Sequence, residues 1–95
     1  MNGYVILSHE ENGTVCVGMG FDLDLLKATA NKTLADIRDE CGLDDMHTVE
    51  VPRMVDANDG IVYAIGNAYI GTEEDDCDII TINQVDFIGD VQQAA

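Results

Sequence analysis

The sequence predicts an α+β fold in which a mainly antiparallel sheet of about five strands, in the order ββαβββ, carries one helix packed on one face. Two β-rich runs joined by a tight-turn signal open the chain, a single amphipathic segment follows, and β-rich runs return from residue 46 onward. Because only one helix separates the two groups of strands, repeated βαβ crossovers are excluded and antiparallel pairing is favoured.

The first two strands are predicted from "YVILSHEENGTVCVGMGF", residues 4–21. Asn12 and Gly13 can adopt the positive φ angles of a type I′ turn between two β-rich runs. A turn centred there would place Leu7 opposite Gly18. A glycine across from a bulky residue indicates either a close approach of the following helix or a local β-bulge.

The only substantial helix is predicted over residues 22–42, "DLDLLKATANKTLADIRDECG". Asp22 suits the N-cap, Asp24 the positive end of the helix dipole, and Gly42 a left-handed C-terminal conformation. Three of the four basic residues belong to this segment, so its outer face is expected to be nearly neutral. Apolar residues at three- and four-residue spacing form a stripe that can lie on the sheet: Leu23, Leu26, Ala30, Leu34, Ile37 and Cys41.

Three further strands are predicted from residue 46 onward. Residues 47–55 and 61–70 flank "DANDG", whose composition suits a hairpin loop. Pro52 lacks an amide hydrogen, so its strand should lie at a sheet edge or carry a bulge. Residues 79–89 supply the fifth strand, in which Gln84 is a candidate break. We expect one domain over residues 1–95, because the chain shows neither a linker nor an internal repeat and can bury one modest core.

The charge of the chain restricts the partners it can bind. Nineteen Asp and Glu residues against four Lys and Arg give a formal net charge of −15. Such a field repels nucleic acid and anionic membrane and attracts basic surfaces, so neither direct nucleic-acid binding nor membrane binding is expected. No signal peptide or membrane span is visible, and the three irregularly spaced cysteines fit a reducing compartment, so a cytoplasmic protein in a host cytosol is expected.

The acidic residues of the second half form the predicted partner-binding site. Carboxylates two residues apart on a strand lie about 7 Å apart on one face, comparable with successive phosphates along a nucleic-acid strand. Such a surface can compete for the Lys and Arg side chains that grip the phosphate backbone, and the rings of Tyr63, Tyr69 or Phe87 could serve as anchors. The predicted site residues are Glu73, Glu74, Asp75, Asp76, Asp78, Asp56, Asp59 and Glu50.

In size and composition the chain resembles the DNA-mimic inhibitors that phages and plasmids carry, including anti-CRISPR and anti-restriction proteins. The resemblance rests on a short acidic chain with a compact α+β pattern. It implies a non-enzymatic inhibitor that occupies the basic, nucleic-acid-binding surface of a host defence or DNA-handling protein and blocks its target. It assigns no role to individual residues.

Two alternatives use the same acidic composition differently. The first is a small structural or assembly protein, with a homodimer through an exposed sheet edge as one form, whose acidic surface maintains solubility. The second is a divalent-cation-binding module built on the carboxylates of "EEDDCD", residues 73–78. An EF-hand is excluded at "DANDGIVY", because Gly60 falls at loop position 5 instead of 6.

The sequence contains no motif that predicts catalysis or a metal site. Neither Cys-x-x-Cys nor His-x₃-His occurs, although His9 and Cys16 could lie across the first hairpin from each other. Cys16 and Cys41 are expected to be small buried hydrophobes. Without a nucleophile motif, a phosphate-binding fingerprint or a P-loop, we expect no enzymatic activity, no cofactor and no bound metal.

Overall fold

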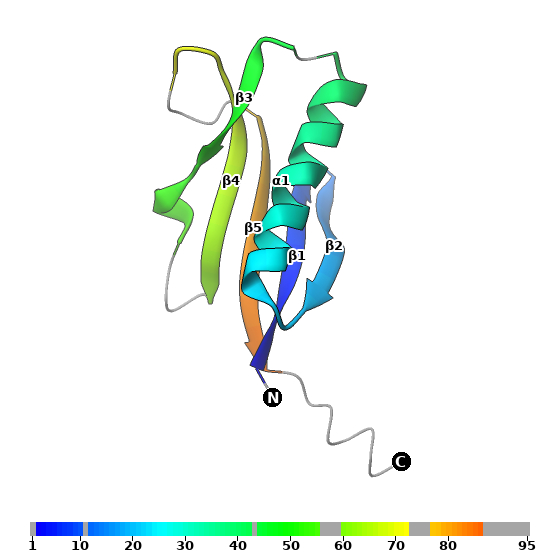
Figure 1. Ribbon diagram of the computed structural model, residues 1–95, viewed down its shortest axis with the longest axis vertical. Helices are drawn as coiled ribbons and strands as arrows, with labels where there is room; N and C mark the ends of the chain where they lie inside the picture. Colours follow the sequence, from blue (N-terminus) through cyan, green and yellow to red (C-terminus); the bar gives the residue numbers. More distant parts are fainter. Residues whose placement is uncertain (1, 11, 43, 56–59, 73–76, 87–95) are drawn as a thin grey trace.

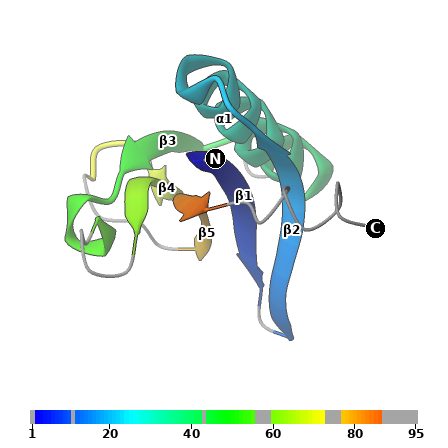
Figure 2. The ribbon, with the colours of Figure 1, turned by 90° about the horizontal axis from the view of Figure 1, so that it is seen from below.

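The computed structural model describes residues 2–10, 12–42, 44–55, 60–72 and 77–86. Its strands form a five-stranded sheet in the order β2-β1-β5-β4-β3, with every neighbouring pair antiparallel. The helix packs on one face of this sheet (Figures 1 and 2), which confirms the predicted α+β fold and the order ββαβββ. The elements are β1 (Asn2–Glu10), β2 (Gly13–Gly20), α1 (Leu23–Glu40), β3 (Met46–Glu50), the 3₁₀ helix η1 (Pro52–Met54), β4 (Ile61–Tyr69) and β5 (Cys77–Asp86).

The hydrophobic core lies between α1 and the middle of the sheet. Leu26, Ala30 and Leu34 are the buried residues of the helix, and they belong to the stripe predicted from the sequence. They pack against isoleucines of three neighbouring strands, and burying each such side chain stabilises the fold by about 1.5–3 kcal/mol. These isoleucines are Ile6 of β1, Ile65 of β4, and Ile80 and Ile82 of β5.

The β1–β2 hairpin turns one residue earlier than predicted. Glu10 pairs with Gly13, and Leu7 pairs with Cys16. The predicted pairing of Leu7 with Gly18 is therefore wrong. Because the turn sequence allows more than one loop position, the hairpin register depends on how the rest of β2 packs under the helix.

A β-bulge at Val17 changes the register of the hairpin, because Val17 is an extra residue between the pairs Leu7–Cys16 and Ile6–Gly18. Beyond the bulge, Gly18 pairs with Ile6, and a Cβ atom on Gly18 would lie 3.2 Å from Ile6 Cδ1. A Cβ atom on Gly20 would lie 3.6 Å from Leu26 Cδ2 of α1. Both alternatives considered from the sequence occur: the bulge lies next to Gly18, and the close approach of the helix is at Gly20.

The later strands differ from the prediction at two positions. β3 ends at Glu50, and Pro52 begins η1, so the strand predicted over residues 47–55 was too long. β3 lies at the edge of the sheet, which was one of the two positions predicted for the strand next to Pro52. β5 continues past Gln84, which pairs with Tyr4 of β1 without a change of register, so the candidate break there was wrong.

The ends of α1 follow the predicted signals. Asp22 is the N-cap, and its Oδ1 accepts hydrogen bonds from the amides of Asp24 and Leu25 at 3.1 and 3.3 Å. Gly42, with φ +69°, follows the C-cap Cys41. Among the described residues, no helix combines the length and the apolar character that a membrane crossing requires.

Cys16 and Cys41 are both exposed, so the expectation that they are buried was wrong. Cys16 lies on the edge strand β2, where its valine neighbours are themselves exposed. Cys41 continues the apolar spacing of the stripe, but the helix ends at Glu40. The cysteine therefore lies beyond the last turn that packs on the sheet.

We expect Gly60→Ala to lower the free energy of unfolding by about 2–3 kcal/mol, since a left-handed backbone alone costs an L-residue about 1–2 kcal/mol. Gly60 has φ +78°, and a Cβ atom there would also lie 3.1 Å from the carbonyl oxygen of Gln84. Gly42→Ala is the control, because Gly42 has φ +69° with nothing within 4 Å of its Cβ position. Urea unfolding of both variants measures the difference, and equal losses would contradict the role of the Gln84 contact.

Candidate functional site

Five chain segments begin or end at the same end of the sheet (upper end in Figure 1). β1 ends there at Glu10, and β5, which runs antiparallel to it, begins there at Cys77. α1 ends there at Glu40, and β3 begins there at Met46, which pairs with Tyr69 at the end of β4. Residues far apart in the sequence therefore lie toward one end of the sheet, with Glu10 and Asp78 on the neighbouring strands β1 and β5, and Asp45 beside the end of β4.

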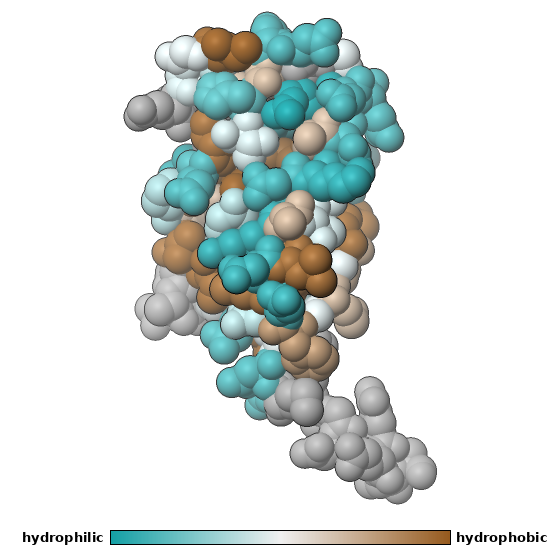
Figure 3. All heavy atoms as spheres, viewed as in Figure 1, coloured by the Kyte–Doolittle hydropathy of each residue, from teal (hydrophilic) through white to brown (hydrophobic). Residues whose placement is uncertain are grey.

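Acidic side chains gather at this end, which we call the acidic end. Its described carboxylates are exposed except that of Asp78, which is half-buried. They are Glu10, Asp39, Glu40, Asp44, Asp45 and Asp78. In Figure 3 the upper end of the molecule is mainly hydrophilic, with a smaller apolar group at its tip.

Elsewhere in the described part of the chain, the charges come closer to balance. The basic residues there are Lys27, Lys32 and Arg53, whereas Arg38 lies at the acidic end, where it donates to Asn67, the pairing partner of Cys77. The acidic residues outside the acidic end are Asp22, Asp24, Asp36, Glu50 and Asp86. The excess of negative charge in the described residues is therefore concentrated at one end of the fold.

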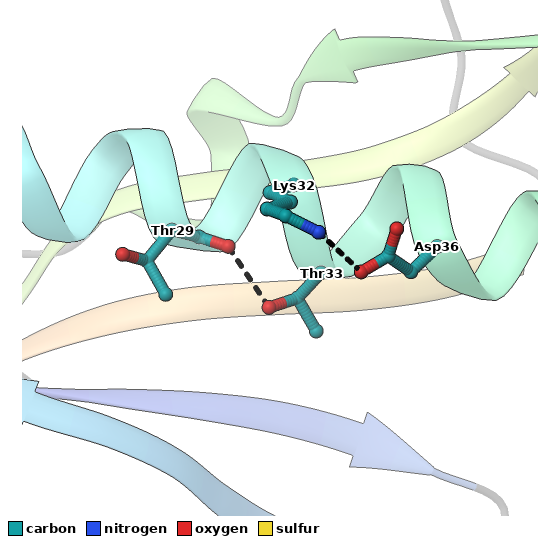
Figure 4. Close-up of polar contacts among 4 residues, drawn as sticks. All are labelled: Thr29, Lys32, Thr33 and Asp36. Atoms are coloured by element: carbon teal, nitrogen blue, oxygen red, sulfur yellow. Dashed lines mark hydrogen bonds and ion pairs between the residues drawn. The ribbon is translucent and has the colours of Figure 1, made fainter.

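The outer face of α1 shows this local balance (Figure 4). Lys32 Nζ forms an ion pair with Asp36 Oδ2 at 3.1 Å, one helical turn away. Next to it, the Thr33 hydroxyl donates to the backbone carbonyl of Thr29 at 2.8 Å. The near-neutral outer face expected from the sequence is present along this part of the helix.

Two other basic side chains make contacts within the fold. Lys27 Nζ lies 5.1 Å from the centre of the Tyr63 ring. The guanidinium of Arg38 donates to Thr48 Oγ1 at 3.4 Å and to Asn67 Oδ1 at 3.5 Å. Although Arg38 lies in the last turn of α1, these contacts direct it toward β3 and β4 on the helix-covered face of the sheet.

Of the predicted site residues, Asp78 and Glu50 fall in the described part of the chain. Asp78 belongs to the acidic end and has φ +53°, a left-handed conformation at the start of β5. Glu50 is exposed at the far end of β3, four residues after Met46, which begins that strand at the acidic end. Four residues of strand span about 13 Å, so Glu50 is not part of the acidic end.

The remaining predicted residues lie outside the described residues: Glu73, Glu74, Asp75, Asp76, Asp56, Asp59 and the candidate anchor Phe87. Thr72 and Cys77, which flank residues 73–76, lie at the acidic end. Gly60, which follows Asp59, accepts a hydrogen bond from Gln84 toward the other end of β5. Six residues of strand separate Gln84 from Asp78, which is about 20 Å.

The structure adds five residues to the site that sequence reasoning missed: Glu10 at the end of β1, and Asp39, Glu40, Asp44 and Asp45 around the end of the helix. The last four share a local signal. The chain joins these residues to the end of β4, where the amide of Ile70 donates to the carbonyl of Asp45 at 2.8 Å. Acidic residues at the C-terminal end of a helix are electrostatically unfavourable, because the last carbonyl groups carry partial negative charge. That local conflict was the signal by which the sequence could have identified them.

Apolar side chains are exposed beside these acids. Tyr69 is 46% exposed and Ile70 is 68% exposed, and both lie at the end of β4 within the acidic end. Tyr63, in contrast, packs against the core, and its hydroxyl accepts a hydrogen bond from Asn31 Nδ2 at 3.0 Å. Of the two described rings considered as anchors, Tyr69 is therefore the one available to a partner.

A hollow of about 560 Å³ opens beside the tip of the β1–β2 hairpin. Glu10 and Asp78 line it, and carboxylates in this position suit the charged end of a lysine or arginine side chain. His9 also lines the hollow and is held by hydrogen bonds to Thr81 Oγ1 at 2.8 Å and Thr14 Oγ1 at 3.5 Å.

The strand register separates His9 from Cys16, the two residues considered from the sequence as a pair of metal ligands. His9 pairs with Thr14 across the hairpin, so its expected position opposite Cys16 was wrong by two residues. Within the described ranges, no group of three or more His, Cys, Asp or Glu side chains is arranged to hold a metal ion.

The acidic residues in the last turn of α1 should reduce stability. We expect Glu40→Gln to raise the free energy of unfolding by about 0.3–1 kcal/mol at low salt, since it removes a charge that opposes the helix dipole. Asp24→Asn is the matched control and should lower it, because Asp24 lies in the first turn. Urea unfolding at low and high salt measures both changes. Two shifts of the same sign would contradict this interpretation.

Comparison of the chain with protein-family models, with curated proteins and with solved structures gives no match. The candidate site is therefore defined by its geometry: carboxylates of four chain segments, two exposed apolar side chains and a hollow lined by two carboxylates, all at one end of a small α+β fold.

Proposed function

We propose that the chain is a non-enzymatic inhibitor whose acidic end binds the basic, nucleic-acid-binding surface of a host defence or DNA-handling protein. The observation that carries the proposal is the separation of charge. Six described carboxylates and one described cation, Arg38, lie at one end, whereas five carboxylates and three cations lie elsewhere in the described residues. By occupying the groove that normally holds nucleic acid, the bound chain would block the target in the manner of anti-CRISPR and anti-restriction inhibitors.

The concentrated charge would act first on the rate of encounter. A surface of one sign steers an oppositely charged partner and accelerates association, most strongly at low ionic strength. It also excludes partners that carry negative charge. The electrostatic cost of placing Asp39, Glu40, Asp44 and Asp45 beside one another would be relieved when cationic side chains of the partner arrive.

Two other features of the acidic end would stabilise the complex after encounter. Tyr69 and Ile70 offer apolar contact area among the carboxylates, and a few such residues usually supply much of the affinity of an interface. The hollow beside Glu10 and Asp78 would hold one lysine or arginine of the partner in a charge-assisted contact. The carboxylates would therefore govern encounter, while the apolar pair and the hollow would slow dissociation.

The first experiment identifies partners by capture on immobilised chain from bacterial lysate, followed by elution with duplex DNA. The proposal expects captured proteins that bind nucleic acid and that DNA displaces. Captured proteins that DNA leaves in place, and that do not themselves bind nucleic acid, would contradict it. Increasing salt should weaken the complexes steeply, because the contacting charges are exposed.

Neutralising the acidic end should weaken partner binding. We expect the triple variant Glu40→Gln, Asp44→Asn, Asp45→Asn to lose about tenfold in affinity, since exposed ion pairs contribute up to ~1 kcal/mol each. The matched control, Asp24→Asn, Asp36→Asn, Asp86→Asn, removes the same formal charge elsewhere and should lose much less. Displacement of labelled DNA from the captured partner measures both. Equal losses would show that only net charge matters.

The exposed apolar pair gives a separate prediction. Ile70→Ser should weaken partner binding by about tenfold while changing the melting temperature little, because the Ile70 side chain is 68% exposed. Val55→Ser is the control, since Val55 is also exposed but lies beyond η1. If the two variants bind the partner equally well, the role of Ile70 as an anchor is wrong.

A further inference from the structure

The two edge strands of the sheet differ in how they are protected against pairing. β3 has five residues, ends in the charged Glu50 and is followed by Pro52, so it is short, charged and stopped by a proline. These features prevent a further strand from adding to a sheet. β2 has eight residues, "GTVCVGMG", with no charged residue and no proline. Only the β2 edge lacks these forms of protection.

Exposed apolar side chains line the β2 edge. Val15, Val17 and Met19 lie on the strand, and Phe21 directly follows it. Leu25, in the first turns of α1, is exposed to the same degree as Met19, 64%. The bulge at Val17 divides the edge into two regular stretches but does not cover these side chains. Val15 pairs with Ser8 and Met19 pairs with Val5, so the exposed apolar strip of the edge strand extends over both faces of the sheet. Exposed apolar groups gathered at one edge usually mark an interaction surface.

We propose that a second copy of this chain docks against the β2 edge, with the two β2 strands antiparallel across a two-fold axis. The surface is self-complementary, as an interface between identical copies must be, because each copy contributes the same apolar strip. This inference does not depend on the proposed inhibitor function, although Thr14 and Val15 of β2 also line the hollow beside Glu10 and Asp78.

Charge is the reason to choose a second copy as the occupant. Two chains that each carry a formal charge of −15 repel each other. They can come into close contact only where charged groups are absent, and residues 12–21 contain none. A basic partner would find no carboxylate along this strand. Antiparallel pairing also places the two acidic ends at opposite ends of the dimer, whereas parallel pairing would set them side by side.

Sedimentation of the whole chain over a wide concentration range tests the proposal. The wild type should change from a 10.3 kDa species to one of twice that mass. Val17→Lys should weaken self-association at least ~tenfold, since a lysine would be buried in the interface. Val55→Lys, the same substitution at another exposed valine, should change it less than about twofold.

Met19→Lys provides a second test at the same edge, in case Val17→Lys does not fold, and melting curves show which variants fold. A wild type that remains a monomer at every concentration overturns the proposal. If Val17→Lys then blocks the binding of a different protein, that protein and not a second copy occupies the β2 edge. Equal weakening by Val55→Lys and the β2 variants also overturns it.

Cys16 reports on the position of the interface directly. It is exposed near the middle of β2, so a short bis-maleimide should join the Cys16 thiols of two copies into a covalent dimer. Cys16→Ser should abolish this product, and Cys41→Ser, at a second cysteine that the structure describes as exposed, should retain it. Loss of the dimer in Cys41→Ser with retention in Cys16→Ser would place the contact elsewhere and overturn the proposal.

Discussion

The contact between one face of α1 and the isoleucines of the central strands is the interaction on which the rest of the structure depends. Leu26, Ala30 and Leu34 lie over residues of β1, β4 and β5, so this contact joins the two halves of the chain. It must also offset the self-repulsion of a chain with a formal charge of −15. Because it fixes where the helix ends relative to the strands, it also determines which acidic residues become neighbours.

The placement of charge follows from this packing. Asp39, Glu40, Asp44 and Asp45 lie at the end of the sheet toward which β1 runs and from which β5 starts, and Asp45 is hydrogen-bonded to the chain at the end of β4. A chain that only needed solubility could distribute its carboxylates over the whole surface. Here the described residues outside the acidic end include five carboxylates and three cations, whereas the acidic end has six carboxylates and one cation. The fold therefore has a distinct acidic region, and this separation is the physical basis of the proposed competition with nucleic acid.

The acidic end and the β2 edge divide the surface between two kinds of interaction. Carboxylates act over a distance and favour partners of opposite charge, whereas an uncharged strand edge acts only on contact. An antiparallel dimer through β2 would leave both acidic ends exposed, one at each end of the assembly. Such a dimer would bind two target molecules, or two parts of one target, without requiring a new contact surface.

The sequence by itself determined the features that depend on neighbouring residues: the ββαβββ order, the Asp22 cap, the end of the helix before Gly42 and the apolar stripe. Spacing and capping chemistry act within a few residues, so they can be read from the chain. Only the tertiary structure decided the bulge at Val17, the exposure of Cys16 and Cys41, and the placement of Glu10, Asp78, Asp39, Glu40, Asp44 and Asp45 at the same end of the sheet. These features depend on the strand order β2-β1-β5-β4-β3, which brings together residues that are far apart in the sequence. Local patterns carry no record of such long-range contacts, and for that reason sequence reasoning identified Asp78 but missed the acids that follow the helix.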